Sequence, residues 1–199
     1  MAIKKETTEV RREQIVKAAL TIIGDEGVQG LTTSKIAKLV GVSEANLYRH
    51  FKNKDAILTA VVDDLEQTLS NNLTIVNAEA IAPLEKLECI FKLQLKHIAQ
   101  NRGIPRIVFS SEVVFRKDLR EKLSSFISHY IGMLAGILDS GIRDGSIKCA
   151  GGSTITAGMF VGMIQLSVLR WSLSGFKTSL LDEGDKLWEA YKENLECQG

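Results

Sequence analysis

The segment 33–54, TSKIAKLVGVSEANLYRHFKNK, constrains the fold more than any other part of the chain. Ile36 and Val40 give a short helix one apolar face, and Gly41 permits the positive φ of a sharp turn. Leu47 supplies the packing face of a second helix. Two short helices joined by a tight glycine turn form a helix-turn-helix, whose second helix can enter the major groove of DNA.

The second helix of this pair has a polar outer face. Ser43 can cap it by accepting a hydrogen bond from a free amide group, so we expect a helix over residues 44–50. Its outward side chains are short or hydrogen-bonding, as contacts with base edges and phosphates require. They are Ser43, Glu44, Ala45, Asn46, Tyr48 and Arg49. The alternative is an ordinary helical pair with a solvated polar face.

Charge favours the DNA interpretation over the solvated one. Residues 1–54 hold ten Lys/Arg against six Asp/Glu, a net charge of +4, whereas residues 55–199 carry a net charge of −3. The positive charge therefore lies with the predicted DNA-reading segment, as an electrostatic footprint for DNA should.

Short motifs in this region occur in a specific order. They are TT at 32–33, IA at 36–37, GVS at 41–43, LYRHF at 47–51 and KNK at 52–54. Together they resemble the N-terminal domain of the tetracycline-repressor (TetR/AcrR) family, and the match covers about the first quarter of the chain. The resemblance implies base-edge contacts by Ser34, Glu44, Ala45 and Asn46. It also implies phosphate contacts by Thr33, Tyr48, His50 and Lys54.

Physical chemistry supports several of these roles. Thr33 and Lys54 stand at helix starts, where the positive end of the dipole favours phosphate, and Asn46 can pair bidentately with adenine. Glu44 fits the predicted set of DNA contacts least well, because phosphates repel its carboxylate unless that carboxylate accepts a hydrogen bond from cytosine. Two cations suit DNA contact and plain solvation equally: Lys35 and Arg49.

The whole chain is predicted to be all-α, with about nine helices and no period-two strand pattern. A first helix, in which Gly24 is a mild local conflict, precedes the pair described above. Asn53 caps a long fourth helix with an apolar stripe from Ile57 to Leu73. The segment PRIVFSSEVVF, from Pro105, is expected as one short helix. We expect an N-terminal helix-turn-helix DNA-binding domain, 1–54, joined by the long helix to a helical ligand-binding and dimerisation domain, 55–199.

Aromatic and methionine residues in the second domain are candidates for a cavity that takes a small apolar molecule. The proposed lining is Phe91, Leu95, Phe109, Phe126, Tyr130, Met133, Met159 and Met163. The alternative is plain core, because such residues at helical spacing mostly pack. Polar residues interspersed among them, as in many ligand sites, favour the cavity.

The last two helices are the expected dimer surface. Gly158 and Gly162, four residues apart, allow another helix to approach closely. Trp188, Tyr191 and Leu195 are expected to anchor a second subunit, because a C-terminal helix has little other core left to cover them. The alternative is packing within one subunit.

Several classes of protein are disfavoured. Cys89, Cys149 and Cys197 are far apart and form no metal or disulfide pattern, and no enzyme motif is present, so neither catalysis nor a cofactor or metal is expected. The N-terminus lacks the apolar core of a secretory signal, and Ser153–Leu169 is marginal for a membrane span, so a cytoplasmic location without membrane contact is expected.

The resemblance implies a homodimeric repressor that leaves a palindromic operator on double-stranded DNA when a small apolar or amphipathic effector binds. The alternative is an effector-independent DNA-binding protein that acts through a protein partner.

Overall fold

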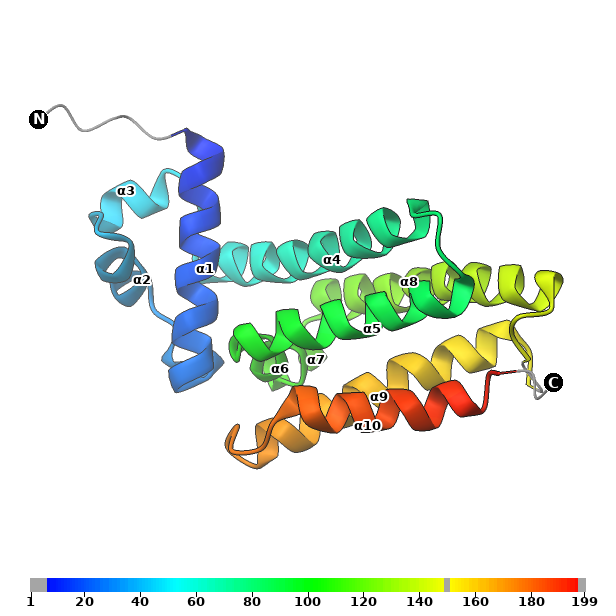
Figure 1. Ribbon diagram of the computed structural model, residues 1–199. Helices are drawn as coiled ribbons and strands as arrows, with labels where there is room; N and C mark the ends of the chain where they lie inside the picture. Colours follow the sequence, from blue (N-terminus) through cyan, green and yellow to red (C-terminus); the bar gives the residue numbers. More distant parts are fainter. Residues whose placement is uncertain (1–6, 149–150, 197–199) are drawn as a thin grey trace, which may run out of the picture. The chain divides into compact units, whose positions relative to one another are not determined.

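The computed structural model describes residues 7–148 and 151–196. Within these ranges the chain is all-α, as predicted, with ten α-helices and one short 3-10 helix, η1 (Figure 1). Their bounds are α1 Thr8–Glu26, η1 Val28–Gly30, α2 Thr33–Val40, α3 Glu44–Tyr48, α4 Lys54–Ala78, α5 Pro83–Gln100, α6 Gly103–Val108, α7 Ser111–Phe115, α8 Lys117–Asp144, α9 Ser153–Leu173 and α10 Leu180–Glu193.

The chain divides into two compact units. Unit 1 consists of Met1–Glu66 and Asn101–Arg120, and unit 2 consists of Gln67–Gln100 and Glu121–Gly199. The chain therefore crosses between the units three times. Two of these crossings lie inside the long helices α4 and α8. The short helices α6 and α7 belong to unit 1, although the helix before them and most of the helix after them belong to unit 2.

The helix ends in unit 1 follow from local chemistry, and the predicted caps are confirmed. Gly27 and Gly41 both have φ +76°, a conformation that glycine adopts without strain. The Ser43 hydroxyl accepts a hydrogen bond from the Asn46 amide at 3.2 Å. Asn53 Oδ1 accepts one from the Ala56 amide at 2.9 Å, which fixes the start of α4 next to α3.

Helices α1 and α6 cross closely, which explains why Gly24 occurs in the middle of α1. A Cβ added to Gly103 would lie 2.3 Å from the backbone oxygen of Leu20, and one added to Gly24 would lie 3.1 Å from the amide nitrogen of Gly103. Both glycines therefore allow the two backbones to touch. Gln29 Nε2 of η1 also donates to Glu112 Oε1 at 2.8 Å, so within unit 1 α6 contacts α1 and α7 contacts η1.

The prediction of a single helix over PRIVFSSEVVF was wrong. The segment breaks into α6 and α7, because the Ser110 side chain accepts a hydrogen bond from the Val113 amide at 3.2 Å and caps a new helix. Serine commonly competes with a continuing helix in this way.

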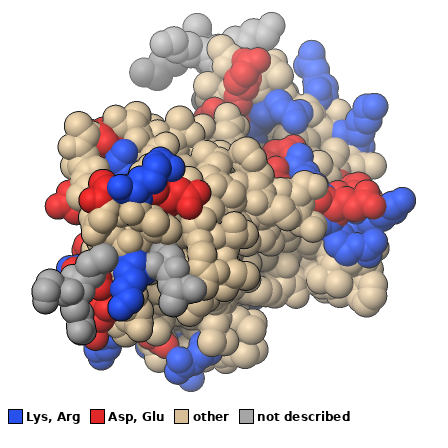
Figure 2. Space-filling model, turned by 90° about the vertical axis from the view of Figure 1, so that its right-hand side faces the viewer, with Lys and Arg blue, Asp and Glu red and all other residues tan. Residues whose placement is uncertain are grey.

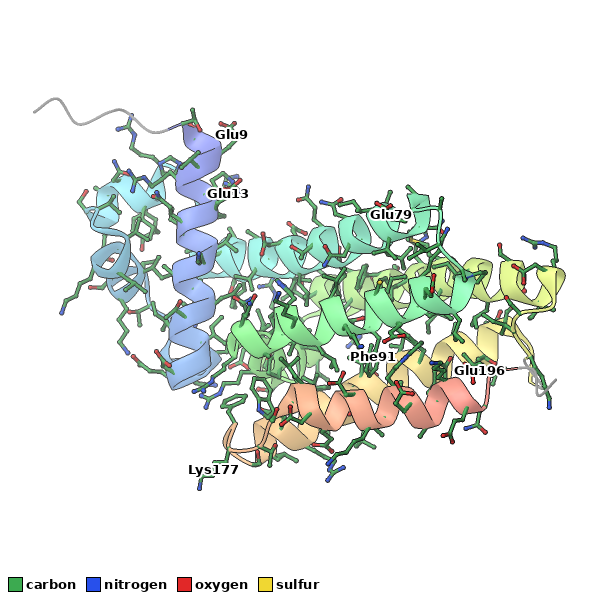
Figure 3. All side chains as sticks on the ribbon, in the orientation of Figure 1. Glu9, Glu13, Glu79, Phe91, Lys177 and Glu196 are labelled. Carbon is green, nitrogen blue, oxygen red and sulfur yellow. The ribbon has the colours of Figure 1, made fainter. Side chains whose placement is uncertain are left out.

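Unit 2 is organised around an aromatic cluster inside its bundle. Phe91 of α5, shown in Figure 3, lies 5.6 Å from Phe160 of α9 and 5.7 Å from Trp188 of α10, measured between ring centroids. Tyr191 packs on Phe160 at 5.9 Å, and its hydroxyl donates to the Thr156 carbonyl at 2.8 Å. These contacts join α5, α9 and α10 through their interior faces.

Helix α9 is long and apolar enough to cross a membrane by length and composition alone. One such helix is weak evidence, since the core helix of a globular protein meets the same criteria. Its inner face is buried through Thr156, Phe160, Ile164, Val168 and Trp171.

Candidate nucleic-acid interface

Helices α2 and α3 form the predicted helix-turn-helix. Ile36 and Leu47 are fully buried where the two helices meet the rest of unit 1. The Val42 amide donates to the Ala37 carbonyl at 2.9 Å and closes the turn at Gly41. Tyr48 is 50% exposed although it is a large aromatic residue. Burying one face in this way leaves the polar face of α3 open to a partner.

A hydrogen-bond network connects the first turn of α2 with α3. Thr33 Oγ1 donates to Glu44 Oε2 at 2.9 Å and lies 3.5 Å from the Tyr48 hydroxyl. The Glu44 carboxylate is thus bound by a hydroxyl group. The carboxylate keeps its negative charge, so Glu44 still repels phosphates unless it accepts a hydrogen bond from cytosine.

Three further side chains of the predicted set have hydrogen-bond or ion-pair partners inside unit 1. The Ser43 hydroxyl caps α3, and the Lys35 ammonium pairs with the Glu26 carboxylate. Lys54 Nζ donates to the Val28 carbonyl at 3.1 Å. Lys35 and Lys54 would have to exchange these partners to reach a phosphate, whereas Ser34, Ala45 and Arg49 are exposed without such a requirement.

Two members of the predicted set have a buried polar atom with no hydrogen-bond partner among the described residues. These atoms are Asn46 Oδ1 and His50 Nδ1. Both atoms are buried, so a side-chain rotation would have to expose them before a base or a phosphate could reach them. The His50 carbonyl, in contrast, accepts a hydrogen bond from Arg12 Nη1.

Arg12 makes structural contacts with the end of the helix-turn-helix that the sequence pattern did not reveal. Its guanidinium carbon lies 4.1 Å from the centroid of the Phe51 ring, in addition to the hydrogen bond to His50. Arg12 joins the start of α1 to the end of α3. Its sequence position is an ordinary exposed site on an amphipathic helix, so no periodicity could have identified it.

The predicted ligand-binding residues do not come together as one set. Phe109 belongs to unit 1, and the other seven belong to unit 2. Phe91 and Leu95 pack tightly against α10, where a Cβ on Gly184 would lie 2.2 Å from Leu95 Cδ1. Met159 is 62% exposed, so its placement in an interior cavity was wrong: it lies on the outer face of α9. Phe126, Met133 and Met163 are half-buried.

Tyr130 is the polar member of this set that lies deepest in the interior. Its hydroxyl donates to Gln94 Oε1 at 3.1 Å, and both side chains are buried. Burial raises the pKa of Tyr130, because the phenolate would lose its solvation. Tyr130 therefore stays neutral and acts as a hydrogen-bond donor inside unit 2.

The placement of the predicted dimer contacts needs correction. Trp188 has no exposed surface, and Tyr191 and Leu195 are 8% and 3% exposed, because all three complete the core of unit 2. They cannot anchor a second subunit directly. The outer face of α9 is different: the Cβ positions of Gly158 and Gly162 meet nothing within 4 Å. Large apolar residues are exposed on the same helix, namely Ile155, Met159, Leu166 and Leu173.

Charges on the face of the molecule shown in Figure 2 are mixed, with acidic and basic side chains next to one another. Pairing of this kind occurs on α5, where the Lys92 ammonium donates to the Glu88 carboxylate at 2.6 Å and lowers the pKa of Glu88. Such a mixed surface offers no field of one sign to DNA.

A helix-turn-helix whose polar face is open, carried on a chain with a second helical unit, defines a DNA-binding regulator. Residues 15–61 match the family described as bacterial regulatory proteins, tetR family, and residues 58–191 match the YsiA-like protein, C-terminal region. The chain belongs to the TetR family of transcriptional regulators, which are not enzymes.

Relatives with similar sequences include nucleoid occlusion factors. SlmA of Vibrio campbellii is 30% identical, over 94% of this chain and 96% of the relative. SlmA of Photobacterium profundum is 27% identical, over 98% of this chain and 100% of the relative.

Among solved structures, the chain resembles the transcriptional regulator FadR from Bacillus subtilis in complex with stearoyl-CoA. The TM-score is 0.75 at 26% identity, over 92% of this chain and 98% of FadR. A TetR-family regulator from Agrobacterium tumefaciens gives a TM-score of 0.81 at 16% identity, over 96% of this chain and 100% of that chain, and so shows a shared fold.

Proposed function

We propose that this chain is a cytoplasmic homodimeric repressor that leaves a palindromic operator when a small, largely apolar effector binds. Residues 1–54 would form the DNA-binding domain, and residues 55–199 the ligand-binding and dimerisation domain. One helix-turn-helix contacts only a few base pairs. Two copies related by a two-fold axis would therefore read half-sites centred about 34 Å apart.

The observation that carries release by an effector is the membership of α6 and α7 in unit 1. These helices contact α1 and η1 through Gly103 and Glu112, and α1 packs against α2 of the helix-turn-helix. Yet α6 and α7 are covalently held between α5 and α8. Helix α4 also runs unbroken from the first unit into the second. A ligand that binds one arrangement of α5 and α8 more tightly than another would therefore change the affinity for DNA. The size of the change is set by the difference between the two ligand affinities.

The class of effector is suggested by the similarity to FadR, whose structure holds stearoyl-CoA. The buried Tyr130–Gln94 pair offers a polar group inside an otherwise apolar interior, as ligand sites of this kind require. An acyl-CoA is therefore the first effector to test.

The test begins with DNA. The purified protein is incubated with a library of random duplexes, and the bound sequences are determined. Two inverted half-sites are expected. Stearoyl-CoA is then titrated into the complex with the selected duplex, with free coenzyme A as the control. Release by stearoyl-CoA alone supports the proposal. DNA affinity that does not change with either compound counts against an acyl effector.

A second candidate function is an effector-independent DNA-binding protein that acts through a protein partner. Two observations favour it: the relatives named nucleoid occlusion factor, and the interlocked rings of Phe91, Phe160 and Trp188 inside unit 2. In this case stearoyl-CoA should change neither the DNA affinity nor the melting temperature of the protein.

A further inference from the structure

The Thr33 hydroxyl group donates its one hydrogen to Glu44. Thr33 Oγ1 lies 2.9 Å from Glu44 Oε2, so the bond runs from the first residue of α2 to the first residue of α3 (Figure 1). An ionised carboxylate only accepts hydrogen bonds, so the hydroxyl is the donor. The family resemblance implies that Thr33 contacts a phosphate instead. A hydroxyl group that donates to Glu44 has no second hydrogen to donate to a phosphate.

The other carboxylate oxygen of Glu44 is open to a partner. Glu44 is exposed, and the Thr33 hydroxyl is the one group among the described residues that donates to its carboxylate. The bond to Oε2 restricts the direction of Oε1 without using it. Ser43 and Ala45, on either side of Glu44, are short and exposed, so Glu44 reaches further than its neighbours in the chain. In a docked helix-turn-helix, the first residues of the second helix are the ones that contact base edges.

A purely structural bond between α2 and α3 does not account for the charge of Glu44. Among the described residues no salt bridge neutralises this carboxylate, and phosphates repel it. A neutral glutamine would accept the same hydrogen bond from Thr33 without this repulsion. In the major groove, a carboxylate is suited to the N4 amino group of cytosine, whereas the amino group of adenine lies beside the N7 acceptor.

We propose that Glu44 recognises a cytosine in each half-site and that Thr33 is its positioning residue. Thr33 holds Oε2, and this bond directs Oε1 to the cytosine N4 amino group. Thr33 therefore acts on base preference, not on phosphate affinity as the resemblance implies. The inference rests on the proposed recognition of a palindromic operator and adds the chemistry of one base contact to it.

The experiment selects half-sites from a random duplex library with the full-length protein, and then measures affinities for the selected operator and its single-base variants at one salt concentration. Glu44→Gln should lower the preference for cytosine at one position of each half-site about fivefold or more, because the charged acceptor is lost. Thr33→Val removes the donor with little change of shape. It should lower the same preference about twofold to tenfold, because Glu44 must then lose rotamer freedom on binding.

Two controls accompany these variants. Thr33→Ser keeps the hydroxyl group and should keep the cytosine preference. Thr21→Val is matched to Thr33→Val, but the Thr21 hydroxyl donates to the Lys17 carbonyl of its own helix, so base preference should not change. Circular dichroism melting confirms that each variant folds, and Thr33→Ala replaces Thr33→Val if it does not.

A double substitution separates positioning from direct contact. In a Glu44→Ala background, Thr33→Val should have no further effect on base preference, because no carboxylate is left to position. If Thr33→Val lowers the affinity for every duplex by the same factor, Thr33 is a phosphate contact and the positioning role is wrong.

Failure of this inference and failure of the proposed function have different signatures. If the library yields inverted half-sites but wild type and Glu44→Gln have the same base preferences, the cytosine contact is refuted and operator recognition is not. If the library yields no inverted half-sites, recognition of a palindromic operator is refuted, and the cytosine contact with it.

Discussion

We expect the side chains on α2 and α3 to divide into phosphate contacts and base contacts. Tyr48 is half exposed, and its hydroxyl lies 3.5 Å from Thr33 Oγ1, which donates to the Glu44 carboxylate. Asn46, on the same helix, is half-buried, and its Oδ1 atom has no hydrogen-bond partner among the described residues. A phosphate contact adds affinity for every sequence, whereas an amide contact with a base edge adds affinity for one base.

We therefore predict different consequences for two substitutions. Tyr48→Ala should weaken binding to all duplexes by a similar factor. Asn46→Ala should reduce discrimination at one base position in each half-site, by about 1–3 kcal/mol, because a bidentate contact with adenine is lost. Affinities for the selected operator and for its single-base variants, measured at one salt concentration, check both outcomes. If Asn46→Ala lowers the affinity for every duplex by the same factor, Asn46 does not recognise a base.

A second residue-scale prediction concerns the α1–α6 crossing. Gly103→Ala would place a methyl group against the backbone oxygen of Leu20, where no flexible side chain can move aside. We expect it to lower the free energy of unfolding by about 1–3 kcal/mol, as overpacking usually does. Urea denaturation measures the change. Lys96→Ala, at an exposed position of α5, is the control and should stay within about 0.5 kcal/mol of wild type.

At the scale of elements, the ends of helices could be predicted from the sequence, because they depend on residues close by in the chain. Gly41, Ser43 and Asn53 act within a few residues of their own positions, and the structure has all three as predicted. The sequence shows Gly24 only as a mild conflict within its helix. The backbone that requires a glycine there lies more than seventy residues away in the chain. The roles of Trp188 and Tyr191 were misjudged for the same reason: the sequence does not show that Phe91 and Phe160 cover them.

The connection between α7 and α8 is tied to the first turn of α4 by one arginine. The Arg116 guanidinium pairs with Asp118, lies 3.5 Å from the Asp55 carboxylate and donates to Thr59 Oγ1 at 3.2 Å. The hydrogen bond from Arg116 lowers the pKa of Asp118. A carboxyl group whose pKa is lower in the folded state stabilises the fold above its unfolded pKa, and this stabilisation is lost as the pH falls through the folded pKa.

Arg116→Gln should therefore raise the pKa of Asp118 toward its ordinary value of about 3.9. The stability difference between wild type and variant should be small, since Asp118 is exposed, and it should shrink further as the pH falls through the folded pKa of Asp118. Carbon-detected NMR titration of the carboxyl groups measures the shift. Asp144 is an internal control, because its lowered pKa depends first on hydrogen bonds from Ser146. An Asp118 pKa that does not respond to the substitution would contradict the assignment.

At the scale of the whole molecule, the proposed recognition of a palindromic operator needs a second copy of the chain. The family resemblance found in the first quarter of the sequence indicated this requirement, but the predicted contact residues were mostly interior. The outer face of α9 is the better candidate, since it exposes Met159 and Leu166 beside two glycines with free space above them. A monomeric protein rarely leaves a stripe of this kind exposed.

The dimer proposal predicts that Met159→Glu produces a monomer, because it places a charge at the centre of this stripe. Light scattering coupled to size-exclusion chromatography measures the mass. Affinity for the palindromic operator should fall by at least about a hundredfold, whereas weak binding to a single half-site should persist, since only the linkage between two readers is lost. Ile75→Glu is the matched control: Ile75 is also 62% exposed, but it lies on α4. A Met159→Glu protein that remains dimeric, or an Ile75→Glu protein that becomes monomeric, would show that α9 is not the dimer surface.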